Sequence, residues 1–422
     1  MSYFKKSSIC NGVDLIYIDS DKFKTEKISI TFFLPLDEKT ASYNFVLSSM
    51  LKRQCQKYPG FLELDKELAK LYGAKLSSYV FKLGEAHALT ISITGIKDRF
   101  AVSNEEMSRE ISNLLCELVF RPYLDEEGYF SKDALLEQKR ELLEKMEAEY
   151  NDKRYFAKLR CEELMCKGEP FCVNKYGSAD IIKKVKPKDL YLAWQRCLKN
   201  AKVEIVQIGG SNFLSTKDIF ERAFETVDRK DIESPVTKIV EANGIHEYND
   251  TMEVTQCKLV MGFRVDFKEG KSLENRLMTA IFGGTPSSKL FLNVREKLSL
   301  CYYCSATYDK NKSIMLVQSG VENKNIEQAK TEILNQLKEM KAGRISQEEI
   351  ESAQKSLINL YKTSNDSLSS IENFYISQSF DDDILTVEEV CDKLRKVTKQ
   401  EIIDAANCVT LDTIYVLRGE DA

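Results

Sequence analysis

The sequence predicts an α+β protein of two homologous halves, each a two-layer α/β sandwich with a mainly antiparallel sheet. Three observations support this. The chain has 422 residues, 43% of them hydrophobic and 30% charged, which is typical of globular domains. Segments with the two-residue period of strands alternate with segments of helical period. The order of the elements in the first half returns in the second, at an offset of roughly 210–230 residues.

In the first half, the periodicity predicts a strand, two helices, an antiparallel strand pair, three helical stretches and a closing strand. In order, these lie at about 25–34, 38–54, 61–72, 74–82, 86–94, 102–118, 130–165, 187–198 and 202–208. Gly73 suits the C-terminal cap of the second helix, and the strand pair turns near Gly84. The stretch 130–165 is dense in alternating charge, which favours a solvated helix and leaves a partner-facing helix open.

The second half gives the same order. The elements lie at about 254–264, 271–283, 286–298, 301–308, 313–320, 325–341, from 346 onwards, 398–407 and 412–418. Ser346 and Glu349 have the spacing of a capping box, so a long helix should begin there.

A polar, charged stretch at 226–250 separates the halves and contains Pro235 and Gly244, as a linker would. We therefore expect an N-terminal half over 1–225, a linker over 226–250 and a C-terminal half over 251–422.

Bulk composition excludes several classes of protein. The net charge is only -5, from 61 basic and 66 acidic residues, which argues against nucleic-acid binding. We see no signal-peptide pattern and no apolar stretch long enough to span a bilayer. The 12 cysteines are scattered, as expected for reduced thiols. We expect a cytoplasmic protein with no membrane partner.

One string in the second half is distinctive. Residues 282–291 read Phe-Gly-Gly-Thr-Pro-Ser-Ser-Lys-Leu-Phe, followed by Val-Arg-Glu-Lys at 294–297 and Leu-Cys-Tyr at 300–302. This spacing resembles the C-terminal half of the pitrilysin/insulinase family of zinc peptidases, which includes the mitochondrial processing peptidases. Further matches in the first half extend the resemblance to nearly the whole chain, at 71–76, 169–170 and 176–177.

The zinc motif of that family is missing. Active members carry His-x-x-Glu-His on the first long helix, where two histidines one turn apart bind zinc and the glutamate acts as base. The matching positions are Phe45, Ser48 and Ser49, none of which is a strong zinc ligand or a base. The third ligand would fall near Glu144, and one carboxylate cannot hold a catalytic zinc. The resemblance therefore implies that this chain holds no metal and that, in isolation, it has no catalytic residue.

The substrate-contacting positions are retained. In the family, an arginine and a tyrosine at the places of Arg295 and Tyr302 grip the substrate beside the zinc. From spacing alone, two structural roles are also open. Arg295 could be a helix-end arginine paired with a carboxylate, and Tyr302 could be packed in the sheet. Gly283 and Gly284 resemble a glycine loop that some non-catalytic subunits use to touch substrate. The alternative is a turn that needs the positive φ of glycine.

For the histidines and for several cysteines, the sequence favours structural roles. His87 lies in an alternating strand and is expected at a surface or interface, and His246 belongs to no zinc motif. Cys301 and Cys304 lie three apart on a predicted strand, so they should face opposite sides. Spacings of five and six predict packing thiols rather than a metal knuckle at Cys161, Cys166 and Cys172.

The resemblance implies a zinc-free subunit of a heterodimeric peptidase. It would pair with a homologous zinc-bearing subunit that carries His-x-x-Glu-His, complete the peptide-binding chamber and supply Arg295 and Tyr302. Two alternatives stay open: an inactive scaffold in a larger assembly, and a peptide-binding protein that uses strand addition without a partner.

Overall fold

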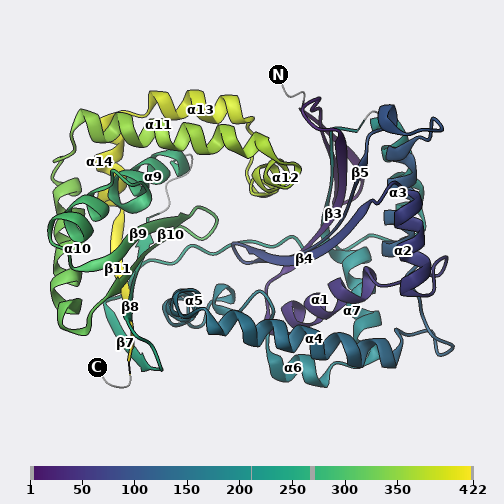
Figure 1. The fold of residues 1–422 in the computed structure, drawn as a ribbon, viewed down its shortest axis with the longest axis horizontal. Coiled ribbons are helices and arrows are strands. Elements are labelled where there is room, and N and C mark those ends of the chain that lie inside the picture. Colours follow the sequence, from purple (N-terminus) through teal and green to yellow (C-terminus); the bar gives the residue numbers. More distant parts are fainter. Residues whose placement is uncertain (1–3, 211, 267–270, 420–422) are drawn as a thin grey trace. The chain divides into compact units, whose positions relative to one another are not determined.

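The structure is a computed structural model that describes residues 4–210, 212–266 and 271–419. It divides into two compact units (Figure 1). Unit 1 comprises Met1–Met146, Val173–Val236 and Asp366–Ile384, and unit 2 comprises Glu147–Cys172, Thr237–Asn365 and Leu385–Ala422. Each unit therefore contains one segment that comes from the opposite half of the sequence.

The sheet of unit 1 has the strand order β1-β2-β6-β3-β5-β4 in the described residues. β2 and β6 are parallel, and the other neighbours are antiparallel. In β3, Ile30 and Phe32 join the core on one face, while Phe33 joins a core on the other, as the two-residue period requires. The strands are β1 (Phe4–Cys10), β2 (Val13–Ile18), β3 (Thr25–Pro35), β4 (Lys75–Leu83), β5 (Ala86–Ile96) and β6 (Lys202–Ile208).

Helices of the first half cover one face of this sheet. Asp37 begins α1 as its N-cap, because its carboxylate accepts a bond of 2.8 Å from the backbone N of Thr40. The helices are α1 (Glu38–Leu51), α2 (Phe61–Lys70), α3 (Met107–Phe120), α4 (Lys132–Asn151), α6 (Ala179–Lys184), α7 (Pro187–Asn200) and α8 (Phe213–Glu225).

The opposite face is covered by α12 (Leu368–Ile376), which comes from the second half of the sequence (Figure 1). Tyr375 of α12 belongs to the same buried cluster as Phe33 of β3. Lys27 Nζ lies 2.5 Å from Glu372 Oε2, with both side chains nearly inaccessible to solvent. These contacts attach the segment Asp366–Ile384 to unit 1.

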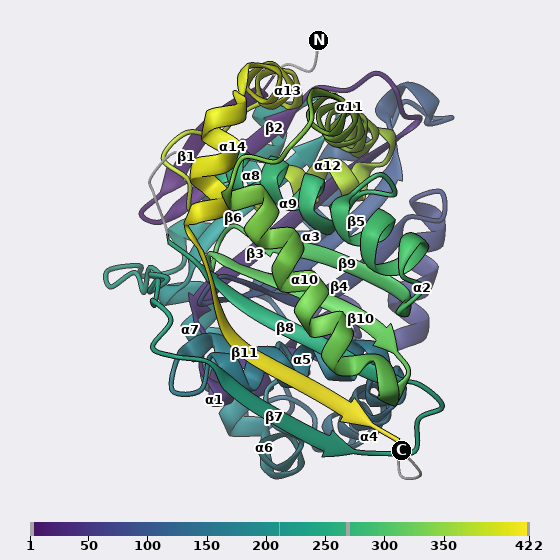
Figure 2. The ribbon, with the colours of Figure 1, turned by 90° about the vertical axis from the view of Figure 1, so that its left-hand side faces the viewer.

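The sheet of unit 2 repeats this plan, with the order β7-β11-β8-β10-β9 in the described residues (Figure 2). β7 and β11 are parallel, and their neighbours are antiparallel. Apart from β1, the two sheets share strand order and the place of the parallel pair, which confirms the duplicated α+β unit and shows that each sheet is mixed. The strands are β7 (His246–Thr251), β8 (Cys257–Val265), β9 (Cys301–Asp309), β10 (Ile314–Val321) and β11 (Val409–Arg418).

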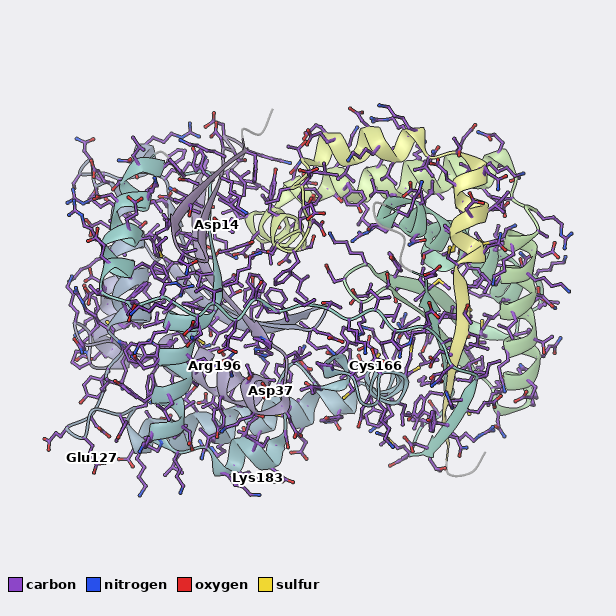
Figure 3. All side chains as sticks on the ribbon, turned by 180° about the vertical axis from the view of Figure 1, so that it is seen from behind. Asp14, Asp37, Glu127, Cys166, Lys183 and Arg196 are labelled. Carbon is purple, nitrogen blue, oxygen red and sulfur yellow. The ribbon has the colours of Figure 1, made fainter. Side chains whose placement is uncertain are left out.

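The unit 2 sheet also has a helix from the other half on one face. α5 (Lys153–Met165) packs Cys161 against Val260 and Leu316, and Cys166, labelled in Figure 3, caps the end of α5. The elements from the second half are α9 (Ser272–Thr279), α10 (Ile326–Lys341), α11 (Gln347–Thr363), α13 (Val387–Lys396), α14 (Lys399–Asn407) and two π-helical segments, η3 (Ala280–Gly284) and η4 (Leu290–Lys297).

The helical stretch predicted over 130–165 is broken. Asp152 ends α4 and caps α5, because its carboxylate accepts bonds of 3.0 and 3.1 Å from the backbone N of Arg154 and Tyr155. The periodicity did not predict β1, β2, α6, α8, α12, α13 or β7. The last of these, β7, begins within the stretch predicted as a linker over 226–250 and ends one residue beyond it.

Candidate functional site

The helix that should carry a zinc motif is closed against metal. Phe45 is 3% exposed, and its ring stacks on Tyr176 with centroids 4.2 Å apart. Ser48 and Ser49 donate hydrogen bonds of 2.7 and 2.8 Å to the carbonyl oxygens of Phe45 and Val46, one turn earlier in α1. Both hydroxyls are therefore occupied within the helix.

A cation occupies the neighbourhood where the third ligand would lie. The ammonium of Lys145, on α4, is 5.7 Å from the centre of the Phe45 ring and 5.5 Å from that of Tyr176. Glu144 points elsewhere, with its carboxylate 69% exposed and 4.0 Å from Arg140. Zinc does not fit this site. Phe45, Ser48 and Ser49 offer no nitrogen, sulfur or carboxylate ligand, and Lys145 places a positive charge nearby. The sequence gives no signal for the Lys145 contact.

Neither of the two histidines is among these residues. His87 was expected at a surface or interface; this is wrong, because the ring is fully buried. Its Nδ1 lies 3.2 Å from Asn44 Nδ2 and its Nε2 lies 2.8 Å from the carbonyl oxygen of Lys175. Burial lowers the pKa of His87 to about 4, so it is neutral at physiological pH. His246 is exposed on β7 and lies 3.0 Å from Asn243.

No group of three or more His, Cys, Asp or Glu side chains that could hold a metal occurs within the described ranges 4–210, 212–266 and 271–419. Within the same ranges, no helix has the length and apolarity needed to cross a bilayer.

Arg295 lies on η4 with its side chain 40% exposed. Its guanidinium is 4.6 Å from the centre of the Phe291 ring, and its Nε lies 3.6 Å from Glu296 Oε1. An ion pair this exposed contributes at most about 1 kcal/mol, so it does not tie up the guanidinium. π-Helical turns often occur at functional sites, and this one presents Arg295 to solvent.

Tyr302 is 69% exposed on β9, the last strand of its sheet. On β10, Val321 pairs with Cys301 and Gly320 pairs with Tyr303, so Tyr302 is the extra residue of a β-bulge. The bulge turns its side chain outward. Tyr303 instead lies beneath the Arg154 guanidinium, 4.1 Å from its ring centre, and burial raises its pKa to about 12. The expectation that Tyr302 is packed in the sheet is therefore wrong.

The same bulge corrects the prediction for the nearby cysteines. Cys301 and Cys304 do not face opposite sides: both are buried, at 9% and 4% exposure, because the extra residue shifts the alternation by one. A hydrogen bond with the Cys304 thiol lowers the pKa of Cys301. Cys161 and Cys166 are buried and Cys172 half-buried, as packing thiols should be.

Gly283 and Gly284 form the end of the π-helical segment η3. Neither has a positive φ, so the prediction of a turn that needs glycine's left-handed backbone is wrong. A Cβ on Gly283 would lie 2.8 Å from the backbone N of Ala306 on β9 and 2.7 Å from Leu290 Cδ1. Gly283 therefore permits the helix to approach the strand that carries Tyr302, whereas Gly284 has more room.

This chain is similar to proteins of the peptidase M16 type. The model of a family described as "Peptidase M16 inactive domain" matches residues 184–357. A protein of Bacillus subtilis (strain 168) named "Probable inactive metalloprotease YmfF" is 27% identical over 430 residues, covering 100% of this chain and 99% of that protein.

Solved structures extend the similarity. A conserved protein from Enterococcus faecalis V583 has a TM-score of 0.90 and 27% identity, covering 99% of both chains. A peptidase M16 inactive domain from Pseudomonas fluorescens has a TM-score of 0.78 and 14% identity, covering 99% of this chain and 98% of that chain, and shows the fold alone. The resemblance predicted from the sequence is confirmed: this chain is similar to proteins described as inactive members of the M16 peptidase type.

Proposed function

We propose that this chain is the non-catalytic subunit of a heterodimeric, cytoplasmic M16-type peptidase. It completes the peptide-binding chamber of a homologous partner that carries His-x-x-Glu-His and zinc. Arg295 and Tyr302 of this chain act on peptide bound at the partner's zinc site. No zinc is held by this chain.

The observation that carries this proposal is the contrast between the zinc-motif positions on α1 and the pair Arg295 and Tyr302. The α1 position is filled by an aromatic stack, whereas Tyr302 is turned outward by a bulge and is 69% exposed, with no hydrogen bond from its hydroxyl to any described residue. A packing role would favour burial of this tyrosine, so its exposure supports contact with a ligand. Arg295 adds a forked, permanently charged donor suited to a peptide carbonyl. Tyrosine can donate to the oxyanion that develops during peptide cleavage.

The test reconstitutes the complex with a zinc-bearing homologue from the same source and measures turnover at saturating peptide. Tyr302→Phe should slow turnover by about 100- to 1000-fold, because one oxyanion donor is lost. Arg295→Lys should also slow it, since an ammonium lacks the planar fork.

The control is Tyr303→Phe, which removes a hydroxyl from the adjacent ring stacked beneath Arg154 and should leave turnover unchanged. Wild-type turnover in Tyr302→Phe, with the complex intact by size-exclusion chromatography, would contradict the trans-acting role. The runner-up function, a peptide-binding protein or scaffold without a zinc partner, is favoured by the place of β9 at the end of its sheet among the described residues, where an extended peptide could add as a further strand.

A further inference from the structure

A cavity of about 290 Å³ lies in unit 2 at the hairpin end of β9. Thr307 and Tyr308 of β9 form part of its wall. Lys158 reaches it from α5 and Arg276 reaches it from α9. Because α5 packs on the sheet face that contains Val260 and Leu316, two cationic side chains from separate helices meet at the edge strand.

The acidic side chains of this cavity already have partners. Glu162 Oε1 lies 3.2 Å from Lys158 Nζ, one helical turn away on α5. Asp309 Oδ1 accepts bonds of 2.9 and 3.1 Å from the backbone N of Asn311 and Lys312 at the hairpin turn. Neither carboxylate neutralises the guanidinium from α9.

Arg276 is the unbalanced charge. Its Nη1 donates a 2.8 Å hydrogen bond to the hydroxyl of Tyr361, while its Nε is buried and has no acceptor. No carboxylate lies within ion-pair distance of it among the described residues. A half-buried guanidinium without a counter-charge is unfavourable, and an anion entering the cavity would supply one.

The cavity continues a basic line along β9. Arg154 lies one turn before Lys158 on α5; its guanidinium covers Tyr303, and its Nη2 is 3.4 Å from Ser305 Oγ. Arg295 lies beside the start of the strand. With about 3.3 Å per residue, Tyr308 is about 20 Å along the strand from Tyr302. An extended peptide on this edge would therefore pass both.

We propose that this cavity, between Lys158 and Arg276, binds an acidic side chain of an extended peptide, about six residues from the peptide residue beside Tyr302. The proposal rests on the proposed function only in that the chain binds peptide along β9. The proposal predicts that the preferred peptides carry an acidic residue near one defined end.

The test measures binding by the isolated chain, without a zinc partner, using fluorescence anisotropy. The probe is a labelled dodecapeptide of alternating Thr and Val with blocked ends, compared with versions that carry one Asp at successive positions. An Asp near one end should strengthen binding about tenfold, because a charged hydrogen bond is gained. The gain should shrink as salt is raised.

In Arg276→Gln, the gain from Asp should disappear while the neutral peptide binds as before. Lys158→Met, which keeps the apolar stem, should reduce the gain and provides a second variant if Arg276→Gln melts early. Arg222→Gln, an exposed arginine paired with Asp218 on α8, is the matched control and should keep the full gain.

Three results overturn the proposal: no gain from Asp at any position, an undiminished gain in both cavity variants, or no binding of either kind of peptide. Because these measurements need no zinc partner, they are independent of turnover in Tyr302→Phe. No acidic preference in the wild type, together with slow turnover in Tyr302→Phe, would refute only the cavity. An acidic preference that depends on Arg276 and Lys158, together with normal turnover in Tyr302→Phe, would refute only the trans-acting role.

Discussion

Gly283→Ala tests the close approach of η3 to β9. The added Cβ would lie 2.7 Å from Leu290 Cδ1, 2.8 Å from Ala306 Cβ and 2.8 Å from the backbone N of Ala306. Leu290 can rotate, but the backbone of β9 is held by its hydrogen bonds to β10. Restoring an ordinary contact of about 3.4 Å to Ala306 requires a shift of about 0.6 Å.

Overpacking of this kind costs about 1–3 kcal/mol, and replacing a helical glycine returns about 0.5–1 kcal/mol. The net loss should be about 1–2 kcal/mol. For a unit of this size, that corresponds to a fall in melting temperature of about 2–8 °C. Gly284→Ala is the matched control: its nearest atom is Thr279 O at 3.3 Å, so its stability should be unchanged or slightly raised.

The assay is thermal and urea denaturation of the isolated chain, followed by circular dichroism. If Gly283→Ala melts with the wild type, or if both alanine variants lose the same stability, the packing explanation is wrong. Loss of peptide cleavage with full stability would instead favour direct contact between Gly283 and substrate.

Three further predictions concern charged and titratable side chains. Glu169→Gln should lower the free energy of unfolding in urea by about 3 kcal/mol. Arg264 and Lys312, 2.5 and 2.7 Å away, lose the carboxylate that they share, while Asp412 stays 3.3 Å from Arg264. Glu163→Gln, at an exposed pair, should change little, and equal effects would contradict this. The pKa of His87 is lowered to about 4 by burial, so the unfolded chain binds a proton that the folded chain does not. Stability should therefore fall by about 3 kcal/mol as pH drops from about 6.5 to 4, and this part of the pH dependence should vanish in His87→Gln but persist in His246→Gln. Finally, Phe45→His, Ser48→Glu and Ser49→His together should not create a tight zinc site. The Lys145 ammonium lies 5.7 Å from the Phe45 ring, and its repulsion of a doubly charged zinc ion at that distance would cost about 1.5 kcal/mol even at the dielectric constant of water. Adding Lys145→Glu should improve zinc affinity by more than tenfold in a competition titration, and tight binding by the triple variant alone would refute the role of Lys145.

The repeated strands and long helices could be predicted from sequence because each carries a regular period. β3 alternates between two cores, and α10 and α11 have clear apolar stripes. α12 also has an apolar stripe, at Leu368, Ile371, Tyr375 and Ile376, but the sheet that this stripe covers comes from the other half. Its role depends on a contact with Phe33 across more than 300 positions, and local periodicity carries no record of such a contact.

The candidate site could likewise be predicted only in part. The absence of zinc ligands follows from residue identity at Phe45, Ser48 and Ser49, and no geometry was needed. The outward turn of Tyr302 was not predictable, because a β-bulge inserts one residue into the pairing and reverses the alternation of Cys301 and Cys304. His87 was placed wrongly because β5 is packed on both faces: Leu89 joins the core on one face and Ala88 joins the core on the other, so the polar positions are buried too.

The exchange of segments between halves has a consequence for biosynthesis. On the ribosome, the first sheet is complete once Ile208 has been made, yet the helix that covers its second face ends only at Ile376. The segment that belongs to unit 1 ends at Ile384, about 150 residues after Val236. The roughly 170 residues between Ile208 and Ile376 take about 8–34 s to make at about 5–20 residues per second, so the nascent chain exposes Phe33 and Val206 to solvent for that time before α12 can dock. During that interval the half-built unit has an apolar sheet face open to other nascent chains, which makes it a client for chaperones that hold growing polypeptides. Expression of residues 1–225 alone would make the interval permanent, and we expect that fragment to aggregate.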